Sequence, residues 1–448
     1  MGKSFTGILT AALIFFFVFL AACRNGVLES EDQAGKTAKV LLHVWGNQPL
    51  NEFLPIINAF EKEYKDIEIV YHVYQASDAA QNLKLETNLL SGGSNVDLYF
   101  TYTTQALSKR VKGKMALDLS KLCERDHFDM EKNFTENVTK FYYGQKPYSV
   151  PTTVGKMGII LNKDMFDAAG IEIPTDWDFE EFREICQRLT RGEGSDKVYG
   201  VFWNTQANPS EALLHLALPT LGGDPLYKNG GQKSNLADPV LISALKLMDE
   251  TMNIDGSAPD YKESEIRKLS MEEMFFGEHC AMTVGAWMYG TATNTEDYPH
   301  DFVTAFAPWP VADKNERNYT QGSFGGHMSI NPNSQNVEEA WTFIKWYSTE
   351  GALLNIPWGY TPCCTGFSQE TIETELFRNS NGLLDEESAK RVLLNPDTNL
   401  SIPVIEFKID IITEIFDNAV EAALTGKKDV EAALKNAEKT ADEALQQK

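Results

Sequence analysis

The segment from residue 144 to residue 189 constrains the fold more than any other part of the chain, because a strand is interrupted inside it and a new strand and helix begin after the interruption. Two apolar, strand-like runs follow each other there. Pro151 and Gly155 interrupt them, so a single central strand cannot continue through the segment. Further on, Asp178 and Glu181 have the spacing of a capping box and predict the start of a helix with one apolar face. A strand that ends in this way, before a new strand and helix begin, indicates that the chain leaves one lobe and enters another.

The residues before this segment alternate apolar strands with amphipathic helices. Strands are expected at 39–45, 67–74 and 96–100, and helices at 50–64 and 78–90. This order is typical of a doubly wound α/β unit with parallel strands, and in such sheets ligands bind beyond the carboxyl ends of the strands. The predicted fold class is therefore α/β.

The residues after this segment predict a second set of strands and helices. Strands are expected at 197–203 and, with small residues, at 281–284. Trp287 is expected to lie at the end of the second of these strands. Residues 302–311 are interpreted as a return crossing to the first lobe, and a third crossing is expected near 350–351. The chain therefore predicts two lobes joined by three crossings.

The N-terminus has the composition of an export signal. Lys3 precedes an almost wholly apolar run at 8–20, and Cys23 follows Leu-Ala-Ala. The run is too short for a comfortable membrane-spanning helix, and it ends in small residues as signal peptides do. We expect residues 1–22 to be a signal peptide and the polar residues 23–38 to be a flexible tether. An uncleaved N-terminal anchor is the alternative.

Composition and motifs exclude several classes of function. The net charge of −24 argues against nucleic-acid binding, which needs a basic surface. The seven His show no metal-ligand spacing, and there is no P-loop and no Gly-X-Ser-X-Gly motif, so no metal, cofactor or catalytic residue is expected. Five cysteines remain after Cys23, and an odd number does not indicate a disulfide framework. A bond between the adjacent Cys363 and Cys364 would be strained.

Several segments, taken in order, resemble the family 1 extracellular solute-binding proteins of bacterial ABC importers. The sugar-binding, maltose-binding-like branch is nearest. The crossing segment carries most of the resemblance, in the runs 148–151 (YSVP), 160–164 (ILNKD) and 174–177 (PTDW). The helix, small-residue strand and Gly-X-Trp at 274–287 and the glycine-rich strand entry at 322–330 are similar to further landmarks of that family.

The resemblance implies a two-lobed, type II-like periplasmic-binding-protein fold, in which each lobe is a doubly wound, mostly parallel sheet and three crossings form the hinge. Lobe 1 would comprise residues 39–150 and 304–350, and lobe 2 residues 151–303 and 351–448. The resemblance also implies cleavage before Cys23 and lipidation of that cysteine. A lipid anchor of two or more acyl chains would hold the protein at the extracytoplasmic face of the cell membrane.

Candidate ligand contacts are taken from the strand ends and the crossings. Flat aromatic faces cover the C–H side of a pyranose, and polar side chains or exposed backbone groups bond its hydroxyls. The aromatic candidates are Trp45, Trp203, Trp287, Trp309 and Trp358. The polar and backbone candidates are Asn47, Asp78, Tyr102, Thr152, Thr153, Gly325 and Gly326. Core packing is the alternative for each tryptophan, and solvation or capping is the alternative for each polar residue.

Together these features predict a monomeric substrate-binding lipoprotein of an ABC importer. It would capture a mono- or oligosaccharide between its lobes and deliver it to the membrane permease without catalysis. One alternative is a surface glycoside hydrolase or lyase, which needs two carboxylates facing one cleft, and the sequence offers no obvious pair. Another is a binding protein for a non-sugar solute such as a glycerol-phosphodiester. A phosphate favours Arg or Lys beside the cleft, and none stands at the expected strand ends.

Overall fold

The computed structural model describes residues 39–74, 79–92, 95–205, 209–285, 288–395, 399–401 and 408–447. The predicted signal peptide, the tether and the lipidated Cys23 lie outside these ranges. Two candidate ligand contacts, Asp78 and Trp287, also lie outside them. In the described ranges, no helix combines the length and the apolar character needed to cross a membrane.

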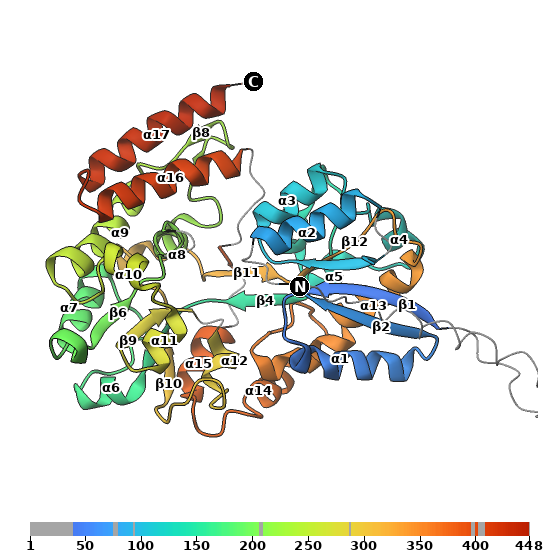
Figure 1. Cartoon of the computed structure of the whole chain (residues 1–448), viewed down its shortest axis with the longest axis horizontal. Coiled ribbons are helices and arrows are strands. Elements are labelled where there is room, and N and C mark those ends of the chain that lie inside the picture. The colour runs from blue at the N-terminus through green and yellow to red at the C-terminus, as the bar shows by residue number, and fades with distance from the viewer. Residues whose placement is uncertain are drawn as a thin grey trace, which may run out of the picture. The chain divides into compact units, whose positions relative to one another are not determined.

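The first sheet contains the β-α-β-α-β unit that the sequence predicts. Its strands lie in the order β12 (His327–Ile330), β3 (Leu98–Thr101), β1 (Val40–Gly46) and β2 (Ile67–Val73). β1 pairs in parallel with both β2 and β3, whereas β12 is antiparallel to β3. The helices that connect the parallel strands are α1 (Leu50–Glu63) and α2 (Ala79–Leu90) (Figure 1). The predicted parallel unit is confirmed.

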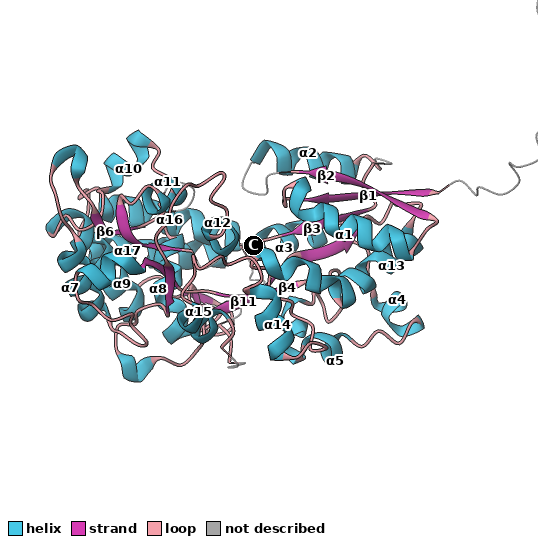
Figure 2. Ribbon diagram, turned by 90° about the horizontal axis from the view of Figure 1, so that it is seen from below, coloured by secondary structure: helices cyan, strands magenta, loops and turns pink. Residues whose placement is uncertain are grey.

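Helices cover both faces of this sheet (Figure 2). Val44 and Phe100 pack in the core that α1 shares with α13 (Val337–Ser348), whereas Trp45 and Tyr99 pack with Leu85 of α2. Successive strand residues point to opposite faces, so neighbours in the sequence separate in this way. The other helices of this part are α3 (Thr104–Lys112), α4 (Ser120–Arg125), α5 (Met130–Phe134) and the 3₁₀ helix η1 (Glu136–Phe141).

The second sheet departs from the mostly parallel arrangement that we expected. Its order is β10 (Thr304–Ala307), β5 (Ile159–Asn162), β9 (Cys280–Val284) and β6 (Tyr199–Phe202). β9 and β6 are parallel, but β5 runs antiparallel to both of its neighbours. β5 follows a crossing strand after two residues, so its direction is set by that crossing and not by a helical crossover.

Helices of the second part surround this sheet and continue to the C-terminus. They are α6 (Lys163–Ala168), α7 (Phe179–Leu189), α8 (Glu211–Leu221), α9 (Pro239–Asp249), α10 (Tyr261–Arg267), α11 (Met271–Phe276), α12 (Tyr289–Ala292), α15 (Glu386–Leu393), α16 (Ile409–Leu424) and α17 (Val430–Gln446). A two-stranded hairpin of β7 (Tyr227–Lys228) and β8 (Lys233–Ser234) packs against α17.

An antiparallel ribbon connects the two sheets. It consists of β4 (Thr153–Lys156) and β11 (Gly322–Gly325), and the backbone N–H of Val154 also bonds to the carbonyl of Thr361. The return crossing is therefore β11. Our placement of it at 302–311 is wrong, because β10 within that segment is a buried strand at the edge of the second sheet, paired with β5.

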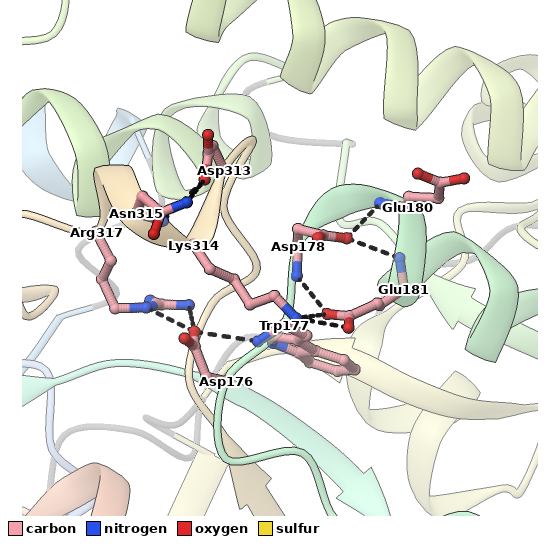
Figure 3. A network of polar contacts seen from close by, with 9 residues as sticks. All are labelled: Asp176, Trp177, Asp178, Glu180, Glu181, Asp313, Lys314, Asn315 and Arg317. Atoms are coloured by element: carbon pink, nitrogen blue, oxygen red, sulfur yellow. Dashed lines mark hydrogen bonds and ion pairs between the residues drawn. The ribbon is translucent and has the colours of Figure 1, made fainter.

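Polar contacts hold the segment after β10 against the start of α7 (Figure 3). Lys314 Nζ lies 2.6 Å from Glu181 Oε1, and Arg317 Nη2 lies 2.7 Å from Asp176 Oδ1. Trp177 Nε1 donates to the carbonyl of Pro308 at 2.6 Å. The predicted capping box of α7 is confirmed, and residues 308–317 stay with the second sheet.

The two largest hydrophobic cores correspond to the two sheets, and their membership corrects the expected lobe boundaries. Ala305 and Trp309 belong to the second core, although we placed 304–350 in lobe 1. Cys363 and Leu400 belong to the first core, although we placed 351–448 in lobe 2. After the 3₁₀ helix η6 (Glu350–Trp358) the chain thus contributes to the first core, then from α14 (Gln369–Leu376) onward to the second core, and then to the first core again. A single boundary in the sequence cannot describe a segment that passes between cores more than once.

Candidate functional site

A pocket of about 330 Å³ lies at the carboxyl ends of β2 and β3. Tyr74 directly follows β2, and Tyr102 directly follows β3. The remaining walls come from α2 and α3. The lining residues are Tyr74, Asn82, Leu83, Glu86, Tyr102, Thr103, Gln105, Ala106, Lys109 and Arg110. This is the edge of the sheet at which an α/β unit places its ligands.

Tyr102 is the predicted site residue that this pocket contains. Its hydroxyl accepts the backbone N–H of Asn47 at 2.9 Å, so two of our candidates lie in contact. Tyr74 donates its hydroxyl to the carbonyl of Phe100 at 2.6 Å. Burial raises the pKa of both tyrosines, that of Tyr102 well above its usual value. The two phenols therefore stay neutral at physiological pH and act as hydrogen-bonding groups, not as bases.

Trp45 supports this region and does not line the pocket. Its side chain is buried, and its Nε1 donates to the carbonyl of Asn95 at 2.7 Å. The indole stacks on His72 with ring centroids 5.0 Å apart and packs in the same small core as Tyr74. In this arrangement Trp45 fixes the strand ends that carry Asn47 and Tyr74.

Charged side chains enter the pocket from α3, which our reading of the strand ends missed. Thr103 caps this helix by accepting the N–H of Ala106 at 3.2 Å, and this cap sets its start. Lys109 and Arg110 follow on the second turn, and helical side chains point back toward the N-terminus, here toward the strand end. The cap at Thr103 was the available signal, because it fixes where the helix begins and therefore which residues stand on its second turn.

Four candidates of the crossing lie together at one end of the ribbon. Thr152 Oγ1 donates to the carbonyl of Gly326 at 3.1 Å, and Thr153 pairs with Gly325. Gly326 has a backbone φ of +58°. The structure thus brings these residues into contact, and the Thr152 hydroxyl is used to hold the crossing strands together.

The described tryptophans of the second part contribute mainly to packing. Trp203 lies in the second core and donates Nε1 to Thr251 Oγ1 at 2.9 Å. Trp309 is also buried there and stacks on His215 with centroids 5.1 Å apart. Trp358 is half-buried at the end of η6. Neither Trp203 nor Trp309 presents an open face to a ligand in this arrangement.

No metal site is present among the described His, Cys, Asp and Glu side chains, since no three of them gather as ligands. The described residues include five cysteines, and all five are free thiols: Cys123, Cys186, Cys280, Cys363 and Cys364. Burial raises the pKa of Cys364 to about 11, so this thiol stays protonated at physiological pH.

Comparison with known proteins agrees with the geometry. Residues 47–353 match the sequence profile of the family described as bacterial extracellular solute-binding protein. This match covers more than half of the chain. The chain belongs to this family of solute-binding proteins.

Relatives of this solute-binding protein include two curated sugar-binding proteins. The maltotriose-binding protein of Pyrococcus abyssi is 23% identical over 75% of this chain and 68% of that protein. The multiple sugar-binding protein of Streptococcus mutans is 23% identical over 75% of this chain and 76% of that protein. Among solved structures, an ABC substrate-binding protein from Listeria monocytogenes in complex with cycloalternan aligns with a TM-score of 0.75 at 19% identity, over 92% of this chain and 100% of that chain. The structural match establishes the two-lobed binding-protein fold.

Proposed function

We propose that this solute-binding protein captures a carbohydrate at the carboxyl edge of its first sheet. The observation that carries the proposal is the pocket that Tyr74, Tyr102 and Thr103 line together with the apolar side chain of Leu83. A sugar offers the matching chemistry, because its hydroxyls donate and accept while its C–H faces are apolar. The sugar-binding relatives named above support the same class of ligand.

The expected binding energy is sufficient for a useful affinity. An aromatic side chain buries about 150–250 Å², and apolar burial contributes about 25 cal/mol per Å². One or two such contacts therefore supply several kcal/mol before the ordering costs of binding are subtracted. Trp287 and Trp358 remain proposed stacking partners, and Asp78, Asn47 and Tyr102 remain proposed hydroxyl contacts.

In the proposed cycle the two lobes close over the sugar by bending at the ribbon of β4 and β11. The loaded protein then presents the sugar to the permease of an ABC importer. Lipidation at Cys23 would tether the protein to the extracytoplasmic face of the cell membrane. We propose that it acts as a monomer and leaves the sugar chemically unchanged.

The pocket supports binding better than hydrolysis. A glycosidase places two carboxyl groups about 5–9.5 Å apart across the scissile bond. Among the described residues that line this pocket, Glu86 is the sole carboxylate, and it is paired with Lys109. A glycerol-phosphodiester is the stronger second candidate, because Lys109 and Arg110 bring positive charge to the pocket.

A thermal-shift screen of the purified protein against mono- and oligosaccharides tests the proposal. A ligand at about 100 times its dissociation constant adds about 2.7 kcal/mol to the free energy of unfolding. We expect a higher melting temperature with at least one carbohydrate. Stabilisation by polyols, phosphodiesters or peptides, with none by any sugar, would contradict the proposal.

A further inference from the structure

Three charged side chains meet at one wall of the proposed sugar pocket. Lys109 Nζ lies 2.7 Å from Glu86 Oε2, and Arg110 Nε lies 3.7 Å from Glu86 Oε1. The side chains of Glu86 and Arg110 are 7% and 1% exposed, whereas that of Lys109 is 62% exposed. One buried carboxylate is therefore shared by two cations.

The guanidinium of Arg110 is held rigidly in this wall. Its Nη1 donates to Thr101 Oγ1 at 2.8 Å and to the carbonyl of Phe100 at 3.2 Å. Its Nη2 donates to Asn82 Oδ1 at 2.8 Å, and its plane lies over the ring of Tyr99 at 5.3 Å. Its buried Nε finds no hydrogen-bond acceptor in the described part of the chain.

The wall carries one more positive charge than negative charge. Lys109, Arg110 and Glu86 are the charged residues among the described residues that line the pocket. Their formal charges sum to +1, although the whole protein carries −24. Glu86 compensates the buried Arg110, so the positive charge in excess stands on the exposed Lys109, where an anion in the pocket can reach it.

We propose that the pocket selects a sugar that carries an anionic group, a carboxylate or a phosphate, and that this group binds beside Lys109 and Arg110. The inference rests on the proposed carbohydrate function and narrows its substrate class. The ammonium of Lys109 has three N–H donors, and its exposure leaves it able to reach an anion in the pocket. Hydrogen bonds between charged groups are about twice as strong as neutral ones, and Arg110 supplies a fixed positive field behind them.

Matched sugars test this selectivity by titration calorimetry on the purified protein. The first series is glucose, glucuronate and glucose 6-phosphate, and the second is galactose, galacturonate and galactose 6-phosphate. Maltotriose and trigalacturonate extend the comparison to chains. We expect the anionic members to bind at least about tenfold more tightly, which corresponds to about 1.4 kcal/mol. A preference for the acids alone would identify the anion as a carboxylate, and a preference for the phosphates alone would identify it as a phosphate.

A pair of lysine variants on the same helix locates the effect. Lys109→Met removes the exposed cation of the pocket wall and keeps its apolar stem. Lys112→Met removes an exposed cation of α3 that does not line the pocket. We expect Lys109→Met to weaken binding of the anionic sugar about tenfold, with neutral sugars within about twofold, and Lys112→Met to change neither. Raising the salt concentration should reduce the preference in the wild type.

Three results would overturn the inference. One is that neutral sugars bind as tightly as their acids and phosphates. This result would leave the proposed carbohydrate function intact. Equal effects of Lys109→Met and Lys112→Met on the affinity for the anionic sugar would show that Lys109 and Arg110 do not bind the anion. The absence of binding by every member of the series would overturn the inference as well, and the thermal-shift screen would then decide separately whether the carbohydrate function stands.

Discussion

At the scale of single residues, the pocket depends on groups that hold one another in place. Tyr102 both lines the pocket and accepts the N–H of Asn47, so its hydroxyl links the ends of β1 and β3. The residues that surround a ligand therefore also carry local stability, and variants there are expected to change binding and unfolding together.

Tyr102→Phe tests this coupling. The variant removes the acceptor of the Asn47 N–H and should lower the free energy of unfolding by about 1 kcal/mol. It should also weaken sugar binding about fivefold, because one polar contact of the pocket is lost. Calorimetric titration measures the affinity. Tyr143→Phe is the control, since Tyr143 is half-buried against the first core and does not line the pocket. Equal affinities in the two variants would show that Tyr102 does not contact the ligand.

Gly326→Ala tests the contact that holds the crossing. The residue has a φ of +58°, and a Cβ there would meet Thr152 Oγ1 closely. Gly230 has a similar φ of +64° with open space around it, so Gly230→Ala carries only the backbone cost of about 1 kcal/mol. We expect Gly326→Ala to cost about 1 kcal/mol more than this control in urea unfolding, because it also displaces Thr152. Identical losses in both variants would contradict this role of the contact.

At the scale of elements, contacts at a helix end hold a distant segment of the chain beside the sheet to which it belongs. The start of α7 is fixed by Asp178, whose Oδ1 accepts the N–H groups of Glu180 and Glu181 at 3.1 and 3.0 Å. Lys314, from the segment after β10, forms an ion pair with Glu181 in the same turn. One short capping sequence therefore anchors two parts of the chain.

Removing this cap should destabilise the second part measurably. Asp178→Ala leaves two helical N–H groups without their acceptor and should lower the free energy of unfolding by about 1 kcal/mol. Glu180→Gln is a matched control in the same turn, because Glu180 is exposed and does not accept in the cap. Urea unfolding compares the two. No larger loss for Asp178→Ala than for Glu180→Gln would show that the cap contributes little.

A carboxylate between α4 and α13 predicts a pH dependence. Hydrogen bonds from Arg125 and Lys345 hold the pKa of Asp126 well below its usual value, and Trp341 Nε1 donates to it at 2.9 Å. A lowered native pKa contributes stability that is fully present above the unfolded pKa of about 3.9 and is lost as the pH falls toward the native pKa. Asp126→Asn should therefore be less stable than the wild type near about pH 7, and the difference should shrink near about pH 2.5. Urea midpoints measure it, and a constant difference across this range would contradict the linkage.

The sequence predicts the local parts of this architecture and misses the pairings over long distances. The capping box at Asp178 and the strands of the first sheet follow from short patterns, and the structure confirms them. The apolar run at 302–311 has the same pattern whether it crosses between lobes or forms an edge strand. Its partner β5 lies far away in the sequence, and this pairing decides the outcome. Lys109 and Arg110 were missed for a different reason, because our candidates were taken from strand ends and these two side chains reach the pocket from the second turn of the next helix.

At the scale of the whole molecule, the two cores have separate apolar interiors, and the crossing strands connect them. This is the arrangement that allows a binding protein to close on a ligand without unfolding either part. The central claim is that the protein binds a carbohydrate reversibly and does not convert it.

One measurement tests that claim most directly. The purified protein is titrated calorimetrically with the carbohydrate that gives the largest thermal shift, and the sugar is then released by denaturation and analysed by chromatography. The account predicts saturable binding of one sugar per chain and recovery of the sugar unchanged. The absence of binding by any carbohydrate, or recovery of shorter products that the protein alone generates, would contradict it.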